Sequence, residues 1–504
     1  MRFTLRTRAS AAVAACLVLA ACGSGGQSAG SGSGGVLRYG TYQPTSLDPR
    51  KSGTLDTLFL EPVYDSLITR TPDGKIQPGL ATEWSFSDGG TVLTMTLRQG
   101  VKFQDGAAFD ANAVKQDIAA AQAKGSLRAA ELAPIKSVDV VDPTHVRLNL
   151  SGPATQMVGV LAGEAGMMIS PTALDKSDLG TNPVGAGPYK VVKNVQGQIT
   201  YQAWDGYWAK NTVKNKELDF TINPDANTLF RGLQSGQLDA VGILAAQAKQ
   251  AKEAGLNVLA TPTTSLWALQ LNVSNPVLAN PKVRQAIGHA IDRQAISDNM
   301  TSGTCVATVQ PFGKGFVGHN DALDDPKLGF DLAQSKDLVT QANAGAIPQL
   351  TLSVSSSTQQ QQLGSILQAE LGAAGIPVKV EVLDQATLTS KRLKGNFDMA
   401  LSLTPTARPD PIIYIADTYI KGGVNNPGGF SSPTVDQLLR NAEQSSDDNA
   451  RGALLAQISA DVYQAGQPMV PICSTTFHFA YRNGVSGLKG PALNDFDWAA
   501  VGVS

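Results

Sequence analysis

The chain has 504 residues, with 40 lysine and arginine against 42 aspartate and glutamate side chains and a formal net charge of −2. Because the charge is nearly balanced and no basic run occurs, we do not expect binding to nucleic acid or to an anionic surface. A chain of this length exceeds what one hydrophobic core usually serves, so two or more lobes are expected.

The N-terminal segment has the features of an export signal. Three arginines precede an apolar run at residues 9–21, which is too short to span a bilayer as a helix. The tetrapeptide LAAC at 19–22 resembles the lipobox of bacterial lipoproteins, in which the cysteine becomes the acylated first residue of the mature chain. We therefore expect a lipoprotein signal peptide at 1–21, lipidation of Cys22 and a Gly/Ser-rich tether through residue 35.

This leader predicts an extracytoplasmic protein, held by its lipid at the outer face of the cytoplasmic membrane or in the periplasm. Without the three arginines of the signal, 37 basic side chains stand against 42 acidic ones, a net charge of −5. An uncleaved membrane anchor or a disordered leader is the alternative interpretation.

After the tether the pattern alternates between strands and helices. Strands are predicted at 37–42 and 91–98, where apolar and polar residues alternate. Helices are predicted from apolar residues at helical spacing at 107–124, 283–296, 332–345 and 359–375, and the last is followed directly by a strand at 376–383. Helices followed by strands indicate lobes of the α/β class.

Two cysteines, Cys305 and Cys473, remain in the exported part of the chain. An oxidising compartment permits one disulfide between them. Two buried free thiols are the alternative that the sequence leaves open.

Motifs for catalysis, metals or cofactors are missing or misplaced. GQSAG at 26–30 has the spelling of a nucleophile elbow but lies in the tether, where no strand and helix can strain the turn. The four histidines lie far apart, without a second ligand at helical or hairpin spacing, so neither a metal nor a cofactor is expected: His145, His289, His319 and His478. We therefore favour a binding protein over an enzyme, with two lobes closing on a ligand.

A penicillin-recognising lipoprotein hydrolase is the less favoured enzymatic alternative. Its support is limited to Ser297-Asp298-Asn299 and to Ser486-Gly487-Leu488-Lys489. These two sequences occur in the reversed order, and no Lys-Thr-Gly follows them.

A series of segments resembles the family 5 extracellular solute-binding proteins of ABC importers, the group of dipeptide, oligopeptide and nickel binders. The segments occur in the family's order and span roughly residues 36–500. They include EPVYDSL at 61–67, PVGAGPYKV at 183–191, FRGLQSGQLDAVG at 230–242, LQLNVSNPVLANPKVRQAIGHAIDRQAI at 269–296 and PGGFSSPTVDQLL at 427–439.

The resemblance implies a two-lobed, periplasmic-binding-protein-like class II fold with an additional inserted subdomain. Lobe I would consist of residues 36–63, 185–263 and 475–504, the inserted subdomain of 64–184, and lobe II of 264–474. Such a protein would be a monomer that captures a small polar solute between lobes I and II and delivers it to the transmembrane permease by hinge closure.

The family's amine-binding aspartate has no counterpart here. In peptide-binding members this aspartate lies just before an acidic-Pro pair, and in LTPTARPDP at 403–411 its place is taken by Ala407. The usual tryptophan is replaced by Thr404, while Arg408 adds a planar cation that suits a carboxylate or phosphate, or that pairs with Asp410 or another neighbour. A peptide or peptide-like solute is the leading expectation, with an oligosaccharide, an opine-like compound or a chelated metal as alternatives.

Eight residues are predicted to contact the solute, because aromatic rings, amides and charged groups suit peptide backbones and sugars alike. They are Tyr42, Thr45, Trp267, Asn272, Arg408, Asp410, Asn425 and Phe430. Trp267 could equally belong to a hydrophobic core.

Overall fold

The computed structural model of the chain describes residues 34–53, 56–71, 75–300, 305–342, 346–406, 410–445, 447–489 and 496–504. The predicted signal peptide, Cys22, most of the tether, Ala407 and Arg408 lie outside these residues. Among the described helices, none combines the length and the hydrophobicity that a membrane span requires.

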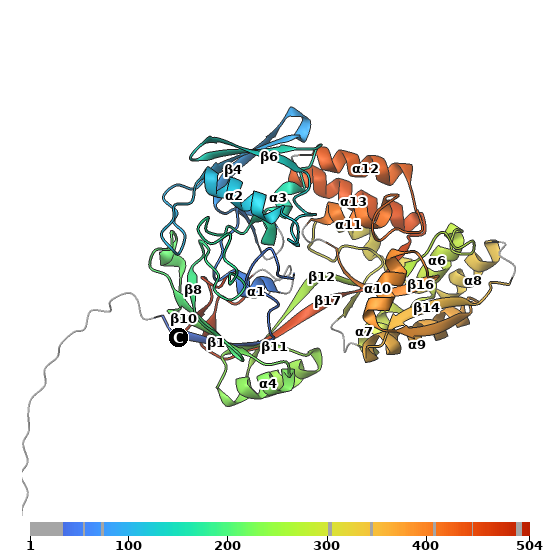
Figure 1. The fold of residues 1–504 in the computed structure, drawn as a ribbon. Helices are drawn as coiled ribbons and strands as arrows, with labels where there is room; N and C mark the ends of the chain where they lie inside the picture. The colour runs from blue at the N-terminus through green and yellow to red at the C-terminus, as the bar shows by residue number, and fades with distance from the viewer. Residues whose placement is uncertain are drawn as a thin grey trace, which may run out of the picture. The chain divides into compact units, whose positions relative to one another are not determined.

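Eleven strands form one mixed sheet (Figure 1). In hydrogen-bonded order they are β15 (Val378–Leu383), β14 (Leu350–Ser355), β16 (Met399–Pro405), β12 (Asn257–Leu271), β17 (Met469–Tyr481), β11 (Ala240–Ile243), β1 (Val36–Thr41), β10 (Glu217–Ile222), β9 (Gln198–Ala203) and β8 (Tyr189–Val195), with β13 (Cys305–Ala307) paired to β17. A separate four-stranded sheet has the order β4 (Ala81–Ser87), β5 (Val92–Leu97), β7 (His145–Leu150) and β6 (Ile135–Asp142). Two short pairs are β2 (Ile68–Arg70) with β3 (Ile76–Pro78) and β18 (Val485–Ser486) with β19 (Gly502–Val503).

The helices pack around these sheets. They are α1 (Thr57–Leu60), α2 (Ala111–Ala121), α3 (Met157–Val160), α4 (Ala226–Ser235), α5 (Ala248–Glu253), α6 (Pro281–Ala290), α7 (Arg293–Met300), α8 (Leu332–Gln341), α9 (Thr358–Ala373), α10 (Gln385–Leu393), α11 (Pro411–Tyr419), α12 (Pro433–Gln444) and α13 (Asp448–Gln464). Most begin at a side-chain cap of the type that the sequence offers, such as Asp110 at α2 and Ser357 at α9.

Separate hydrophobic clusters stabilise different parts of the fold. Around β1 and β10 the cluster is rich in aromatic rings from distant parts of the chain, and Trp498 stacks on Phe496 at 4.8 Å while lying 5.0 Å from the ring of Phe220. Another cluster joins the four-stranded sheet to α2 and α3. Two more lie on opposite faces of β12, one with α6 and α9 and one with α11, α12 and α13. The predicted lobe boundaries stay a prediction, because separate cores do not fix where a lobe ends.

Strands β12 and β17 connect the two halves of the large sheet. They are 15 and 13 residues long and pair from Asn257–Tyr481 at one end to Gln270–Met469 at the other. The first end lies beside β11 and the second beside β16, so the pair continues from one half of the sheet into the other (Figure 1). The register is irregular between Pro262 and Leu266, where proline lacks the N–H that a regular ladder needs.

The predicted helix at 283–296 is two helices. Ile291 has extended backbone angles and ends α6, and α7 begins at Arg293. The guanidinium of Arg293 donates to the carbonyls of Gly288 at 2.8 Å and of Ile291 at 3.2 Å, so it satisfies carbonyls that a continuous helix would have bonded internally. Helical spacing alone does not reveal such a break.

Cys305 and Cys473 form a disulfide, with their Cα atoms 5.4 Å apart. The bond joins the first residue of β13 to β17 and closes a sequence separation of 168 residues. The sequence left open a disulfide or two buried free thiols, and the structure has the disulfide.

Candidate ligand-binding site

The parallel strands of each half of the sheet end near the connecting pair. In one half, β1 pairs in parallel with β10 and with β11, and β11 ends at Ile243 opposite His478 of β17. In the other half, β14 pairs in parallel with β15 and β16, and β16 ends at Pro405 opposite Ser265 of β12. Ligands of open α/β sheets bind beyond the carboxyl ends of parallel strands. Both halves therefore present their ligand-binding edge to the middle of the β12–β17 pair.

We call the residues at this junction the strand-end surface. It consists of residues 261–265 of β12, 474–478 of β17 and 404–406 at the end of β16, together with Tyr42 directly after β1. These segments read TPTTS, STTFH and TPT, so they carry hydroxyls and no carboxylate, lysine or arginine.

Hydroxyl groups connect the three segments. The hydroxyls of Thr263 and Thr475 lie 2.7 Å apart, and Thr475 also donates to the carbonyl of Ser265 at 3.3 Å. Thr406 donates to the carbonyl of Thr264 from its Oγ1 at 2.9 Å and from its backbone N–H at 2.8 Å. These bonds attach the end of β16 to the irregular stretch of β12.

The strand-end surface is electrically neutral. Burial lowers the pKa of His478 below its usual 6.5, since desolvation disfavours the imidazolium. Its Nδ1 lies 3.2 Å from the carbonyl of Thr476 and is therefore the protonated nitrogen of the neutral ring. The described residues of this surface therefore offer hydrogen-bonding groups without a fixed charge. Thr263, Thr264 and Thr406 are buried, whereas Ser265, Thr404 and residues 475–478 are partly exposed.

Two of the predicted contact residues, Tyr42 and Thr45, lie on the exposed turn after β1. Tyr42 is 37 % exposed, and its ring packs edge-on against Phe59 at 5.5 Å. Thr45 is exposed, and its backbone N–H donates to Asp56 at 3.1 Å. Their positions at the carboxyl end of a parallel strand suit contact with a solute.

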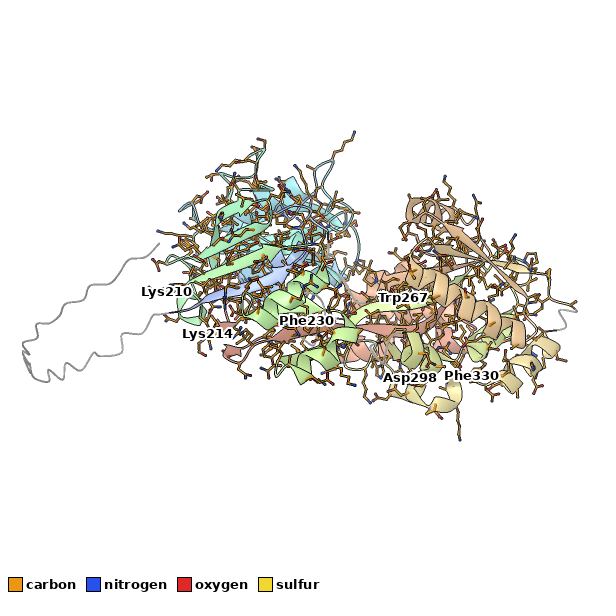
Figure 2. All side chains as sticks on the ribbon, turned by 90° about the horizontal axis from the view of Figure 1, so that it is seen from below. Lys210, Lys214, Phe230, Trp267, Asp298 and Phe330 are labelled. Atoms are coloured by element: carbon orange, nitrogen blue, oxygen red, sulfur yellow. A yellow bond between two sulfur atoms is a disulfide. The ribbon has the colours of Figure 1, made fainter. Side chains whose placement is uncertain are left out.

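Two predicted aromatic contacts are packed inside hydrophobic clusters. Trp267 and Phe430 are each 6 % exposed (Trp267 is labelled in Figure 2). Trp267 belongs to the cluster with α6 and α9, and Phe430 lies with its ring 6.4 Å from that of Tyr419. Core packing accounts for both rings without a solute.

The two predicted amide contacts hold backbone segments together. Asn272 donates to the carbonyls of Gly395 at 2.9 Å and Phe397 at 2.8 Å. The carbonyl of Asn425 accepts from Gln270 Nε2 at 2.7 Å. Structural hydrogen bonds thus occupy the side-chain amide of Asn272, whereas the bond to Asn425 uses its backbone carbonyl and not its side chain.

Asp410 has a structural position as well. Its Oδ1 accepts from the backbone N–H of Ile412 at 2.9 Å, so Asp410 caps α11, in which Pro411 is the first residue. The same carboxylate is paired with Arg451 on α13, and the side chains of the pair are 6 % and 13 % exposed. The alternative partnership of Arg408 with Asp410 is not described, because Arg408 lies outside the described residues.

The hydroxyl-bearing segments were not among the residues predicted from the sequence. Runs such as TPTTS at 261–265 were the available signal, because hydroxyl-bearing residues and a proline there interrupt an otherwise apolar stretch. The contact between Thr263 and Thr475, however, joins positions 212 residues apart. No local spacing predicts such a pairing.

Two sheet halves that are joined by a strand pair, with their ligand-binding edges facing the junction, define a hinged solute-binding protein. Residues 75–426 match the family model described as bacterial extracellular solute-binding proteins, family 5 (middle). The chain belongs to this family. It is the substrate-binding component of an ABC importer, not an enzyme, and the family acts outside the cytoplasm.

Relatives and solved structures agree with this assignment. The glutathione-binding protein GsiB of Salmonella paratyphi A is 33 % identical over 352 residues, which cover 68 % of each chain. The structure of HbpA2 from Haemophilus parasuis superposes with a TM-score of 0.84 at 23 % identity, covering 93 % of this chain and 100 % of that one. AgaA from A. tumefaciens R10, solved with agropinic acid, has a TM-score of 0.75 at 25 % identity, covering 93 % and 98 %. The predicted two-lobed periplasmic-binding-protein fold is confirmed.

Proposed function

We propose that the solute is a short peptide or a peptide-like molecule such as glutathione, bound at the strand-end surface between the two sheet halves. The observation that carries this proposal is the neutral, hydroxyl-lined junction on which both ligand-binding edges converge. Hydroxyls and backbone groups suit the amides of a peptide, which donate and accept hydrogen bonds without a net charge.

The absence of the amine-binding aspartate narrows the class of solute that we propose. Ala407 replaces the aspartate that holds the α-amino group in peptide-binding members, so a solute whose recognition depends on its carboxylates is favoured over an ordinary peptide held by its N-terminus. We propose that Arg408 pairs with such a carboxylate, and that Tyr42 and Thr45 contact the solute from the opposite edge. The 33 % identity to a glutathione-binding protein supports this choice.

An opine-like solute is the second candidate. It is favoured by the 25 % identity to AgaA, whose structure holds agropinic acid. An oligosaccharide or a chelated metal at the same surface is less favoured than either of these.

We further propose that Cys22 carries a lipid that holds a monomeric binding protein at the membrane beside its permease. The LAAC sequence at 19–22 supports this proposal. Intact-mass analysis of the protein from membranes should show an acylated N-terminus at Cys22, and Cys22→Ala should release the protein into the soluble fraction. An unmodified N-terminus at Met1 would contradict the proposal.

Calorimetric titration tests the proposed solute. Glutathione, an ordinary dipeptide, agropinic acid and maltotriose are titrated in turn into the purified protein. We expect saturable binding of glutathione, weakened about 10- to 100-fold by Arg408→Ala, since a charge-assisted hydrogen bond contributes about 1.5–3 kcal/mol. Arg440→Ala, at an exposed position on α12, is the matched control and should leave the affinity unchanged. Binding of maltotriose alone, or of glutathione with no effect of Arg408→Ala, would contradict the proposal.

A further inference from the structure

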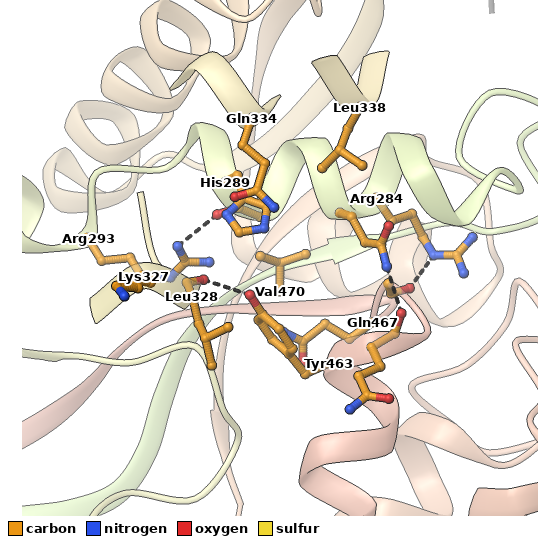
Figure 3. Close-up of a pocket in the computed structure, with 14 residues that line it drawn as sticks. Arg284, His289, Arg293, Lys327, Leu328, Gln334, Leu338, Tyr463, Gln467 and Val470 are labelled. Carbon is orange, nitrogen blue, oxygen red and sulfur yellow. Dashed lines mark hydrogen bonds between the residues drawn. The ribbon is translucent and has the colours of Figure 1, made fainter. Parts of the chain in front are cut away.

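A pocket lies away from the strand-end surface. It has a volume of about 270 Å³ and is formed by α6, the start of α7, the short 3-10 helix Pro326–Leu328, α8, the end of α13 and the start of β17 (Figure 3). None of the residues of the strand-end surface lines it. The proposed function therefore does not use this pocket.

The wall of the pocket carries positive charge. Among the described residues that line it are Arg284, Arg293 and Lys327, and none is an aspartate or glutamate. Arg293 is only 5 % exposed, and burial lowers its pKa to about 10. Glu370 on α9 acts on Arg293 electrostatically, but burial raises the pKa of Glu370 to about 7, so its negative charge is only partly present at neutral pH.

The two arginines differ in the groups that they leave available. Arg284 donates to the carbonyls of Leu278, Ala279, Ala465 and Gly466, which occupies all three of its nitrogens. Arg293 donates from Nε to Pro471 at 2.8 Å and from Nη1 to Gly288 and Ile291. Its Nη2 makes no hydrogen bond within the described part of the chain and is a donor for a ligand in the pocket.

Gln467, which also lines the pocket, has a buried acceptor without a partner. Its residue is 5 % exposed, and its Nε2 donates to the carbonyl of Val309 at 3.0 Å, which fixes the orientation of the amide. Its Oε1 has no hydrogen-bond partner among the described residues. A buried acceptor without a donor costs about 1–3 kcal/mol, so a ligand that donates to it gains that interaction.

We propose that this pocket is a second binding site, for a small carboxylate that also carries a hydrogen-bond donor, that is, a hydroxy or amino acid. The carboxylate pairs with Nη2 of Arg293 and with Lys327, and the hydroxyl or ammonium group donates to Oε1 of Gln467. Tyr463 and Val470 supply the less polar part of the wall, and the hydroxyl of Tyr463 is held by the carbonyl of Leu328 at 2.7 Å.

Calorimetry with L-lactate, glycine and acetate tests this site on the whole protein. Lactate and glycine should bind at least about tenfold more tightly than acetate, since acetate has a carboxylate but no donor for Gln467. Gln467→Glu adds a negative charge beside the hydroxyl of bound lactate, close enough to repel its carboxylate, and should weaken lactate binding more than tenfold. Absence of saturable binding by both lactate and glycine, or equal binding of acetate, would overturn the proposal.

A variant at an exposed position tests the site even if Gln467→Glu fails to fold. Lys327 is exposed, so Lys327→Met should fold as the parent protein does and weaken lactate binding about three- to fivefold. Lys336→Met, at an exposed position on α8 outside the pocket lining, should leave lactate binding unchanged. Equal affinities of the parent and Lys327→Met would count against the site.

The lactate titration is repeated with excess glutathione. An unchanged affinity for lactate would show that lactate does not bind at the strand-end surface, whether or not glutathione binds there.

Discussion

Replacing Asp410 should destabilise the protein by more than the loss of a helix cap. Asp410→Ala removes the cap of α11, which costs about 1 kcal/mol. It also leaves Arg451, whose side chain is 13 % exposed, without its counterion, and breaking a buried pair in this way costs about 3–5 kcal/mol. The Nε of Arg451 already lacks a partner, so little compensation is available within the described contacts. We expect a total loss of about 4–6 kcal/mol.

Asp447→Ala is the matched control for this loss. Asp447 caps α13 by accepting from the backbone N–H of Ala450 at 2.7 Å, and it is exposed, with no ion pair described. Urea unfolding followed by circular dichroism should show a loss of about 1 kcal/mol for this variant. Adding Arg451→Met to Asp410→Ala should restore much of the larger loss, because the unpaired charge is gone. Equal losses for Asp410→Ala and Asp447→Ala would refute the reasoning.

Three further predictions concern packing, protonation and the disulfide. A Cβ at Gly159 would lie 2.5 Å from Asp410 Oδ2, so Gly159→Ala should lower the free energy of unfolding by about 1–3 kcal/mol, whereas Gly152→Ala, with nothing within 4 Å, should not. Burial raises the pKa of Asp117 from 3.8 to about 8, so between about pH 4 and 8 the folded state keeps a proton that the unfolded chain releases. The free energy of unfolding of the parent protein therefore falls as the pH rises through this window. Urea titrations should therefore show Asp117→Asn gaining stability relative to the parent protein, by up to about 1.4 kcal/mol per pH unit in that window, and a constant difference would contradict the assignment. Cys305→Ser should lower the free energy of unfolding by about 2–5 kcal/mol, which appears as a lower urea midpoint under oxidising conditions. The difference between the two midpoints should disappear when the parent protein is reduced.

The secondary structure could be predicted where local spacing determines it. The predicted helix at 359–375 is α9, Thr358–Ala373, and the predicted strand at 376–383 is β15, Val378–Leu383. The break at Ile291 could not be predicted, because it depends on the guanidinium of Arg293, which bonds the carbonyls of Gly288 and of Ile291 itself. Local spacing predicts that a helix forms, whereas the end of α6 depends on hydrogen bonds from the side chain of Arg293 to the backbone.

The candidate site was harder to predict, as Trp267 shows. In β12 the alternation of side chains places Trp267 and Leu269 in one hydrophobic cluster and Leu266 and Ala268 in another, on opposite faces of the strand. Both faces are covered, so a tryptophan here has no solvent-facing side. From sequence, a buried strand and a ligand-lined strand both appear as apolar residues with an aromatic, and only the tertiary pairing separates them.

The register of the connecting strands links solute binding to hinge closure. The β12–β17 ladder is irregular between Pro262 and Leu266, so bending there breaks few backbone hydrogen bonds. Thr406 at the end of β16 donates twice to the carbonyl of Thr264 within that stretch. A solute that contacts residues 404–406 therefore acts on a segment bonded directly to the bending point. Because the hydroxyls at this junction carry no charge, we infer that they bind polar groups of any solute and do not by themselves select one solute over another.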